Sequence, residues 1–279
     1  MIKSYGKINL SLRVIKKLKN GLHNIQSNVM LINIHDEIKI FKINKRKDIV
    51  NFIGKFKGQV DKQDNTIFKT LKLLKKKKFI KKDYFYKIII NKKIPVFSGL
   101  GGGSSNSAFL IKYFLKDKVK KKIINLFEKK IGTDLNLFFY KQCFQKSLYK
   151  ISQYKKNFNF YLIVIFPNVK CSTKLIYSKV KDYSNPTKID FSKLRDKKSY
   201  INFISKEVND LEKISTKKFS ILKKTINFIS KQKNCYFSRM TGSGSACFGV
   251  FKTKSSAKLA LRNVKKEFPK FWCVLTKTI

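Results

Sequence analysis

A run of glycine and serine between residues 95 and 108 is the part of this chain best suited to hold a charged ligand. Four of the twelve glycines in the protein fall within residues 99–103, and three serines and an asparagine follow at residues 104–107. Glycine tolerates positive φ and lets a ligand approach the backbone closely, because it has no Cβ. The apolar segment that follows predicts a helix, which Ser104 or Ser105 can cap.

The elements on either side of this run indicate which ligand it holds. A strand is expected at Tyr86–Ile90 and a helix after the glycines, and a helix N-terminus attracts anions through unpaired N–H groups and a partial positive charge. The order strand, glycine loop, helix therefore predicts a cradle for nucleotide phosphates. No lysine lies between Lys93 and Lys112, which excludes a P-loop, and the Gly-x-Gly-x-x-Gly spacing is absent. A flexible linker is the alternative, but a linker would not be flanked so closely by a strand and a helix.

Residues 95–105, Pro-Val-Phe-Ser-Gly-Leu-Gly-Gly-Gly-Ser-Ser, resemble the ATP-binding motif of the GHMP kinases, a superfamily that includes galactokinase, homoserine kinase and mevalonate kinase. The triple glycine with Ser-Ser-Asn is most similar to the branch that phosphorylates the 2-hydroxyl of 4-diphosphocytidyl-2-C-methyl-D-erythritol in non-mevalonate isoprenoid synthesis. The resemblance implies that ATP binds through Pro95, Val96, Phe97, Ser98, Gly99, Leu100, Gly101, Gly102, Gly103, Ser104 and Ser105.

Two further motifs would supply the reacting groups. Residues 6–10, Gly-Lys-Ile-Asn-Leu, resemble the family's Ala-Lys-x-Asn-Leu, and residues 132–139 resemble its Gly-Ala-Asp-Val-Pro-x-Phe. The resemblance implies that Asp134 takes the proton of the substrate hydroxyl. Lys7 would lie beside the transferred phosphoryl group and keep Asp134 ionised, because a nearby opposite charge favours a carboxylate. The alternatives are that Lys7 is a solvent-facing strand lysine and that Asp134 is a helix N-cap.

Magnesium is expected to arrive with the nucleotide. Phosphoryl transfer depends mostly on positioning and on neutralising charge. In this family, Mg²⁺ carried with ATP would bridge the phosphates through water and a serine hydroxyl. No metal site built by the protein itself is expected.

Five residues are expected, by the same resemblance, to bind the cytidylyl substrate: Asn9, His23, Thr173, Tyr177 and Gly242. Asn9 would face the methylerythritol hydroxyls, and His23 and Tyr177 would meet the cytosine. From residue type alone, His23 is equally a surface histidine and Tyr177 a core residue on a helix face. Leu22 stands where relatives carry an aromatic residue that would stack on the base.

Three of the implied residues belong to further motifs. Thr173 lies in residues 167–177, which resemble the family's Pro-Gly-x-x-x-x-Thr-x-x-x-Phe. Gly242 lies in residues 238–251, a glycine loop between two expected strands that would border the phosphates and support the first loop. Asn65 would lie near the adenine, although an asparagine before an amphipathic helix is also explained as an N-cap.

The elements that must position these residues follow from periodicity and turn chemistry. In the first half, strands are expected at residues 3–14, 27–34 and 37–43, with a turn at 19–21 and another at Asp36, and helices after Asn65 and at 119–130. In the second half, we expect a strand at 160–166, a loop at 182–198, helices at 199–213 and 216–232, a helix at 255–267 and a strand at 271–276.

These elements indicate an α+β protein with the two-domain GHMP kinase architecture. The ATP-binding N-terminal domain is predicted to span residues 1–156; in the family its fold is related to a ribosomal protein domain. A ferredoxin-like C-terminal domain, residues 157–279, would contribute to substrate binding. The boundary is placed at the polar stretch 155–157, and 279 residues are enough for both domains.

The formal net charge of +48 is the strongest feature of the composition. Such a charge attracts nucleic acid without sequence preference. Only five of the 64 basic residues are arginine, however, which is the better residue for bidentate phosphate and base recognition. We therefore expect lysine-rich solvated faces, with no specific nucleic-acid or membrane partner. A basic nucleic-acid-binding protein, or a GHMP kinase acting on another small alcohol, remains the alternative.

The five cysteines are scattered and show no Cys-x-x-Cys spacing, which favours buried or free thiols in a reducing compartment. No apolar signal region or targeting tail is visible, so a cytoplasmic location is expected. The sequence leaves the oligomeric state open.

Overall fold

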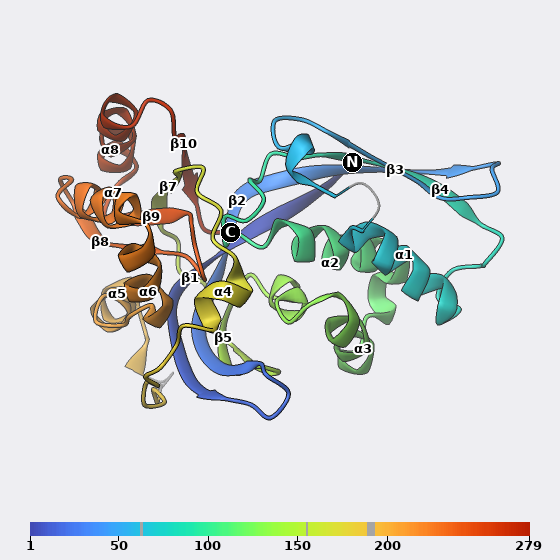
Figure 1. Ribbon diagram of the computed structural model, residues 1–279, viewed down its shortest axis with the longest axis horizontal. Helices are drawn as coiled ribbons and strands as arrows, with labels where there is room; N and C mark the ends of the chain where they lie inside the picture. The colour runs from blue at the N-terminus through green and yellow to red at the C-terminus, as the bar shows by residue number, and fades with distance from the viewer. Residues whose placement is uncertain (62–63, 155, 189–192) are drawn as a thin grey trace. The chain divides into compact units, whose positions relative to one another are not determined.

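The computed structural model describes residues 1–61, 64–154, 156–188 and 193–279, and the chain forms two compact units (Figure 1). Unit 1 consists of Met1–Lys7, Ile34–Val96 and Gly101–Tyr140. Unit 2 consists of Ile8–Asn33, Phe97–Leu100 and Lys141–Ile279. Strands β1 (Ile2–Lys17) and β2 (His23–Ile43) each contribute residues to both units.

The domain division at residues 156 and 157 stays a prediction, because compact units defined by contacts are not the same thing as family domains. Lys155, at the predicted boundary, lies outside the described residues. The mixed strand and helix content confirms the α+β class.

Unit 1 combines strands with three α-helices. Strand β4 (Phe85–Asn91) pairs antiparallel with residues 37–43 of β2 and parallel with β3 (Ile49–Ile53). The helices are α1 (Thr66–Lys76), α2 (Gly102–Leu115) and α3 (Lys121–Ile131), and the short 3₁₀ segments are η1 (Lys57–Gln59), η2 (Lys116–Lys118) and η3 (Leu135–Phe139). Figure 1 shows the three helices on one side of β3 and β4. Apolar residues recur at alternate positions of β4, where Ile88 and Ile90 are fully buried, so the strand turns one face to the helices.

The predicted turn at Asp36 is wrong, because β2 continues through it without a break. Asp36 is completely buried. Its carboxylate accepts hydrogen bonds from the backbone N–H groups of Lys93 (2.8 Å) and Ile94 (2.9 Å) and pairs with the ammonium group of Lys92. These donors follow β4 directly and satisfy the carboxylate inside the fold, so the aspartate does not need a solvated turn.

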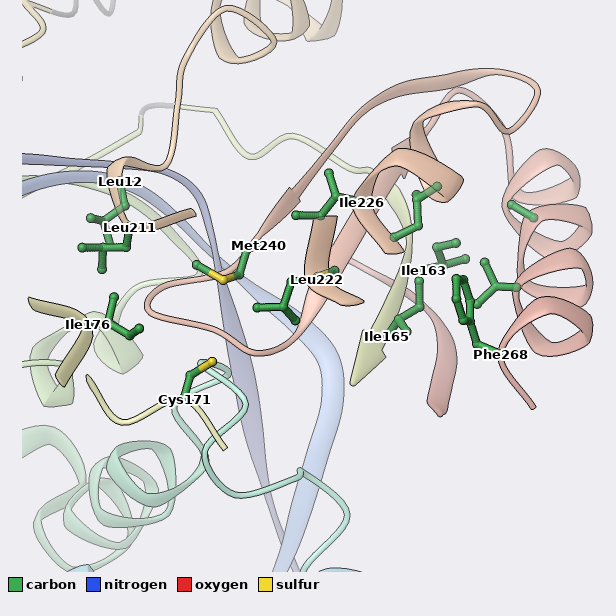
Figure 2. Close-up of a cluster of buried hydrophobic side chains, with 14 of the residues drawn as sticks. Leu12, Ile163, Ile165, Cys171, Ile176, Leu211, Leu222, Ile226, Met240 and Phe268 are labelled. Atoms are coloured by element: carbon green, nitrogen blue, oxygen red, sulfur yellow. The ribbon is translucent and has the colours of Figure 1, made fainter. Parts of the chain in front are cut away.

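Unit 2 contains a four-stranded antiparallel sheet in the order β10-β7-β9-β8. The strands are β7 (Tyr161–Phe166), β8 (Cys235–Met240), β9 (Cys247–Phe251) and β10 (Trp272–Lys277). Helices α7 (Ser220–Ser230) and α8 (Lys254–Glu267) pack against this sheet. Figure 2 shows the apolar core that results, in which Ile226 and Phe268 lie with Ile163 and Ile165 of β7. The predicted strands and helix of residues 160–166, 255–267 and 271–276 are confirmed.

The remaining elements of unit 2 pair with or follow the long strands. Residues 27–30 of β2 pair with β5 (Gln142–Ser147), which continues as a hairpin with β6 (Lys150–Gln153). Three short helices follow: α4 (Thr173–Tyr177), α5 (Lys197–Ile204) and α6 (Asp210–Lys218). In the part of the chain that the structure describes, no helix is both long and apolar enough to span a bilayer.

The single helix predicted over residues 199–213 is wrong, because α5 ends at Ile204 and α6 begins at Asp210. The guanidinium of Arg239 donates hydrogen bonds to the carbonyls of Ile204 (2.8 Å) and Ser205 (2.8 Å). The N–H of Leu12 donates to the carbonyl of Val208 at 2.8 Å. The carbonyls that would continue the helix are therefore bound by partners distant in sequence, and the chain extends between the two helices.

All five cysteines are free thiols, and Cys143, Cys171 and Cys247 are buried. Burial raises the pKa of the Cys143 thiol to about 12, so this thiol stays protonated and unreactive at neutral pH. The expectation of buried or free thiols is confirmed.

Candidate active site

The glycine run forms the first turn of α2 as well as the loop before it. Helix α2 starts at Gly102, and its N-cap Gly101 adopts the left-handed conformation with φ of +71°. A Cβ at position 101 would lie 2.7 Å from Cζ of Phe138 and 3.3 Å from Cε of Lys7. Glycine is therefore required at 101 both by conformation and by close packing. The first-turn N–H groups at residues 102–104 have no acceptor within the helix, so this end of α2 is suited to an anion.

The predicted capping of this helix by Ser104 or Ser105 is wrong, because no side chain caps α2. The hydroxyl of Ser105 is fully buried and donates to the carbonyl of Tyr5 at 2.5 Å, with Oγ of Ser4 at 2.7 Å. Ser105 therefore links the first turn of α2 by hydrogen bonds to the beginning of β1, close in sequence to Lys7.

Lys7 and Asp134 form an ion pair within unit 1. Nζ of Lys7 lies 3.3 Å from Oδ2 of Asp134, and the two side chains are 4% and 38% exposed. Asp134 occupies the N-cap position of η3, but its side chain makes no capping hydrogen bond and pairs with Lys7 instead. The solvent-facing interpretation of Lys7 is wrong, since a buried ammonium group requires a polar partner. The pair presents a carboxylate that water or substrate can reach, held by a cation beside Gly101.

The turn that carries Asp134 is fixed by a second lysine, which the sequence did not reveal. Nζ of Lys112, on α2, donates to the carbonyl of Phe138 in η3 at 2.7 Å. It also lies over the rings of Phe109 (4.6 Å) and Phe139 (5.1 Å). Burial lowers the pKa of Lys112. Nothing in the spacing of the many lysines distinguishes this one, because only the fold brings η3 against α2.

The middle of the glycine motif, Phe97–Leu100, belongs to unit 2 and contacts the glycine loop of residues 238–251, which is the third motif of the resemblance. The carbonyl of Phe97 accepts the N–H of Ser245 (3.4 Å), and the carbonyl of Ser98 accepts the N–H of Ala246 (3.0 Å). At Gly99, where φ is +78°, a Cβ would lie 2.3 Å from the carbonyl oxygen of Thr241. The expectation that the third motif supports the first is confirmed for these residues.

Unit 2 also brings together the two residues expected to meet the cytosine. The rings of His23 and Tyr177 lie 5.1 Å apart at an interplanar angle of 32°, and Tyr183 lies 6.5 Å from His23. His23 is only 8% exposed, so the surface interpretation is wrong. Burial and the charge of Lys17 lower the pKa of His23, which favours the neutral imidazole with one donor and one acceptor nitrogen.

Two exposed side chains adjoin this aromatic group, one by sequence and one by position. Leu22, next to His23 in sequence, is 40% exposed. Tyr183 is 45% exposed and lies in the polar stretch 182–188, which the sequence analysis treated only as loop. An exposed aromatic beside His23 was therefore missed, because periodicity carries no information on where a loop residue lies. Tyr177 itself packs partly against the core of unit 2, which supports the core interpretation in part, and its contact with cytosine stays a prediction.

The remaining predicted substrate residues of unit 2 hold protein contacts around the third motif. Oγ1 of Thr173 lies 2.9 Å from Oγ of Ser243. The carbonyl of Gly242 accepts a hydrogen bond from Asn209 at 2.9 Å. Asn9 is buried, and its Nδ2 donates to Oγ of Ser27 at 2.8 Å. Thr173 therefore contacts the loop that contains Gly242. The side-chain amide of Asn9 is hydrogen-bonded to another residue of the protein.

Asn65, in unit 1, is the N-cap of α1. Its Oδ1 accepts the N–H groups of Ile67 and Phe68, both at 3.1 Å. The N-cap interpretation is confirmed, and contact with adenine stays a prediction.

Comparison with known proteins points to one family. The GHMP kinases N terminal domain matches residues 65–134, and the GHMP kinases C terminal domain matches residues 193–270. The 4-diphosphocytidyl-2-C-methyl-D-erythritol kinase of Pelagibacter ubique (strain HTCC1062) is 38% identical over 282 residues, covering 100% of this chain and 98% of the relative. The enzyme of the same name from Wolbachia pipientis wMel is 28% identical over 288 residues, with the same coverage of both chains.

Solved structures of two kinases have the same fold as this chain. A crystal structure of 4-(cytidine 5'-diphospho)-2C-methyl-D-erythritol kinase matches with a TM-score of 0.76 at 19% identity, covering 100% of this chain and 99% of that one. A homoserine kinase from Cytophaga hutchinsonii matches with a TM-score of 0.69 at 15% identity, covering 100% of this chain and 96% of that one.

Proposed function

The chain belongs to the GHMP kinase family, in the branch of the 4-diphosphocytidyl-2-C-methyl-D-erythritol kinases, and from that premise we propose that it phosphorylates the 2-hydroxyl of 4-diphosphocytidyl-2-C-methyl-D-erythritol. It is an ATP-dependent small-molecule kinase. Its products would be ADP and the 2-phosphorylated substrate, in non-mevalonate isoprenoid synthesis. The observation that carries the proposal is the ion pair of Lys7 and Asp134, at 3.3 Å, beside the N-cap of α2.

The ion pair and the first turn of α2 divide the chemistry between them. Asp134, the more exposed partner, takes the proton of the 2-hydroxyl. The oxygen then bonds to the γ-phosphorus while the bond to the ADP oxygen breaks. Lys7 keeps the base ionised and offsets charge on the transferring group. The N–H groups of residues 102–104 bind the nucleotide phosphates, and Mg²⁺ enters as part of the nucleotide substrate.

Recognition of the cytosine is assigned to the aromatic group of unit 2. Tyr177 supplies an aromatic face, and neutral His23 offers one donor and one acceptor to the polar edge of a base. Thr173 and Gly242 would contact the substrate near the third motif. The free thiols suit a reducing compartment, and we place the reaction in the cytoplasm.

A coupled assay of ADP release over a panel of alcohols tests this function. The cytidylyl substrate is expected to support turnover, and mevalonate, homoserine and galactose are not. A higher kcat/KM for one of those three would replace the proposed substrate while keeping the kinase chemistry. ATP hydrolysis without preference for any alcohol would overturn the assignment of the acceptor.

Replacing Lys7 with methionine should lower turnover much more than ATP affinity. Methionine fills the buried volume but removes the charge that supports Asp134 and the transferring group. We expect a loss of roughly 10²–10³-fold in kcat, the range seen when one stabilising donor is removed. ATP affinity is measured by titration of the same variant. If Lys7→Met changes only KM for ATP and leaves kcat unchanged, Lys7 contributes to ATP binding and not to the chemical step.

Substitutions at Tyr177 and Leu22 should change KM for the cytidylyl substrate and leave KM for ATP unchanged. Aromatic stacking on a base contributes about 1–3 kcal/mol, so Tyr177→Ala should raise KM for this substrate roughly 5- to 150-fold. Leu22→Tyr adds a ring at an exposed position and should lower the same KM roughly fivefold, or about 1 kcal/mol. KM for ATP should not move in either variant.

The control is Tyr236→Ala, which removes an exposed tyrosine from β8. An unchanged or raised KM for Leu22→Tyr would mean that Leu22 does not face the base. The alignment of residues 21–23 with the family motif would then be abandoned.

A further inference from the structure

Three polar side chains on one face of α6 have no role in the chemistry described so far. Asn209, the N-cap of the helix, Glu212 and Ser215 follow one another at intervals of three residues, so they project from the same side. Asn209 is 6% exposed and Ser215 is fully buried. The helix also has an apolar side, since Leu211 belongs to the core of unit 2. Buried polar groups are unfavourable unless they are hydrogen-bonded, so the partners of these side chains show what this face of α6 does.

The first partner is Met240, the last residue of β8. Nδ2 of Asn209 donates to the carbonyl of Met240 at 2.8 Å, and the N–H of Met240 donates to Oε2 of Glu212 at 2.7 Å. Strand β8 lies at the edge of its sheet, where the N–H and C=O of a residue would otherwise pair with a further strand. Helix α6 therefore completes the hydrogen bonding of the strand at the point where the loop to β9 begins.

The same face of α6 binds that loop, residues 241–246. Nδ2 of Asn209 donates to the carbonyl of Gly242 at 2.9 Å, and the hydroxyl of Ser215 donates to the carbonyl of Ser243 at 3.3 Å. The carbonyl of Gly242 and the N–H of Ser243 belong to one trans peptide group, whose C=O and N–H lie on opposite sides. The N–H of Ser243 therefore points away from α6. The helix thus determines on which side of the loop this backbone donor lies.

The part of the loop that α6 contacts is the part assigned to the substrate. Gly242 is one of the residues expected to bind the cytidylyl substrate, and Oγ1 of Thr173 lies 2.9 Å from Oγ of Ser243. The ATP motif depends on the other end of the loop, because the carbonyls of residues 97 and 98 accept the N–H groups of residues 245 and 246. The two ends of the loop therefore serve different ligands, and α6 contacts only the first.

We propose that Asn209, Glu212 and Ser215 are positioning residues for the cytidylyl substrate, which act by keeping residues 240–243 in the conformation that binds it. This proposal rests on the function proposed above and adds to it residues that act through the loop. Its consequence is a difference between the two substrates. Loss of these hydrogen bonds raises KM for the cytidylyl substrate, whereas KM for ATP and kcat stay near their wild-type values.

The kinetics of Asn209→Ala provide the main test. Two hydrogen bonds to residues 240 and 242 are lost, so KM for the cytidylyl substrate should rise roughly 5- to 100-fold. Alanine also removes the N-cap of α6 and should lower the Tm. The matched control is Thr253→Ala, which removes the N-cap of α8 in the same unit and should lower the Tm without changing KM. If Asn209→Ala leaves KM for the cytidylyl substrate unchanged, Asn209 is only a helix cap and the proposal is wrong.

Two further positions on α6 separate positioning from folding. Ser215→Ala removes one hydrogen bond and should raise KM for the cytidylyl substrate roughly 2- to 10-fold. Glu212→Ala should raise the same KM to a similar degree. Glu212→Gln should restore it, because the amide oxygen of glutamine still accepts the N–H of Met240. The proposal is overturned if Glu212→Ala and Glu212→Gln have equal KM values, or if KM for ATP rises as much as KM for the cytidylyl substrate.

Hydrogen exchange of the loop gives a readout that does not depend on the substrate. The amides of residues 241–246 should exchange faster in Asn209→Ala than in the wild type, and at the wild-type rate in Thr253→Ala. Exchange at the wild-type rate in the loop of Asn209→Ala would overturn the positioning role alone. Failure of the wild-type protein to turn over the cytidylyl substrate would instead refute the proposed function, so the two proposals can fail separately.

Discussion

Replacing Asp134 with asparagine is expected to lower kcat by roughly 10²–10⁴-fold, the contribution typical of a positioned general base. Asparagine has nearly the same shape, but its amide cannot take the proton of the substrate hydroxyl. Its oxygen can still accept a hydrogen bond from the ammonium group of Lys7, 3.3 Å away in the native pair, so the fold should tolerate the change. Turnover is measured by ADP release, and ATP binding by the rise in Tm that the nucleotide produces.

The control for Asp134 is a second acid paired with lysine in unit 1. Oδ1 of Asp64 lies 2.7 Å from Nζ of Lys69, and these side chains are 71% and 49% exposed. Asp64→Asn should leave kcat at the wild-type value, because an exposed pair contributes little. A kcat for Asp134→Asn within about threefold of wild type would remove Asp134 from the role of base. Loss of ATP binding together with kcat would instead assign it to the nucleotide.

Replacing Gly101 with alanine should lower turnover almost as much as replacing Asp134 with asparagine. Alanine would have to adopt φ of +71°, and its Cβ would meet Cζ of Phe138 at 2.7 Å and Cε of Lys7 at 3.3 Å. The left-handed conformation costs about 1–2 kcal/mol, and overpacking about 1–3 kcal/mol more. Relief of either strain displaces Lys7 or η3, and a shift of about 1 Å can lower kcat/KM roughly 10²-fold. We expect a lower Tm, and little or no stabilisation by ATP.

Gly103 provides the matched control on the same turn of α2. A Cβ there would lie 3.6 Å from both Oγ1 and Cγ2 of Thr66, which is ordinary contact. Alanine in a helix is more stable than glycine by about 0.5–1 kcal/mol, so Gly103→Ala should keep or raise the Tm. If Gly101→Ala is stabilised by ATP as strongly as the wild type, the assignment of this turn as the phosphate cradle is wrong.

The positions that need glycine are only partly those that the motif suggests. Positive φ occurs at Gly99 and Gly101, whereas Gly102 already belongs to α2. A side chain at 102 would instead lie 3.2 Å from Cγ2 of Ile94 and from Nζ of Lys92. A run of adjacent glycines does not distinguish conformational need from close packing, because both select the residue without a Cβ.

The sequence by itself determined the glycine-rich turn before α2, most strands and helices, and the family. These depend on local patterns: alternation in β1, the continuous apolar run of β7, the helical period of α1 and α8, and contiguous motifs. The motifs also identified Lys7 and Asp134, which composition could not separate from the many other lysines or from the capping acids. Their distance, their burial and the exposure of the carboxylate came from the fold alone.

Several errors of the sequence analysis share one physical cause. Asp36 was expected to turn the chain and Ser104 or Ser105 to cap a helix, and an N-cap was the alternative offered for Asp134. A short polar side chain can satisfy its hydrogen bonds with neighbouring backbone or with groups distant in sequence, and the two arrangements have similar energies. Only the local partners are visible in a sequence. The tertiary structure instead gave Asp36 the donors after β4, Asp134 the ammonium of Lys7 and Ser105 the carbonyl of Tyr5.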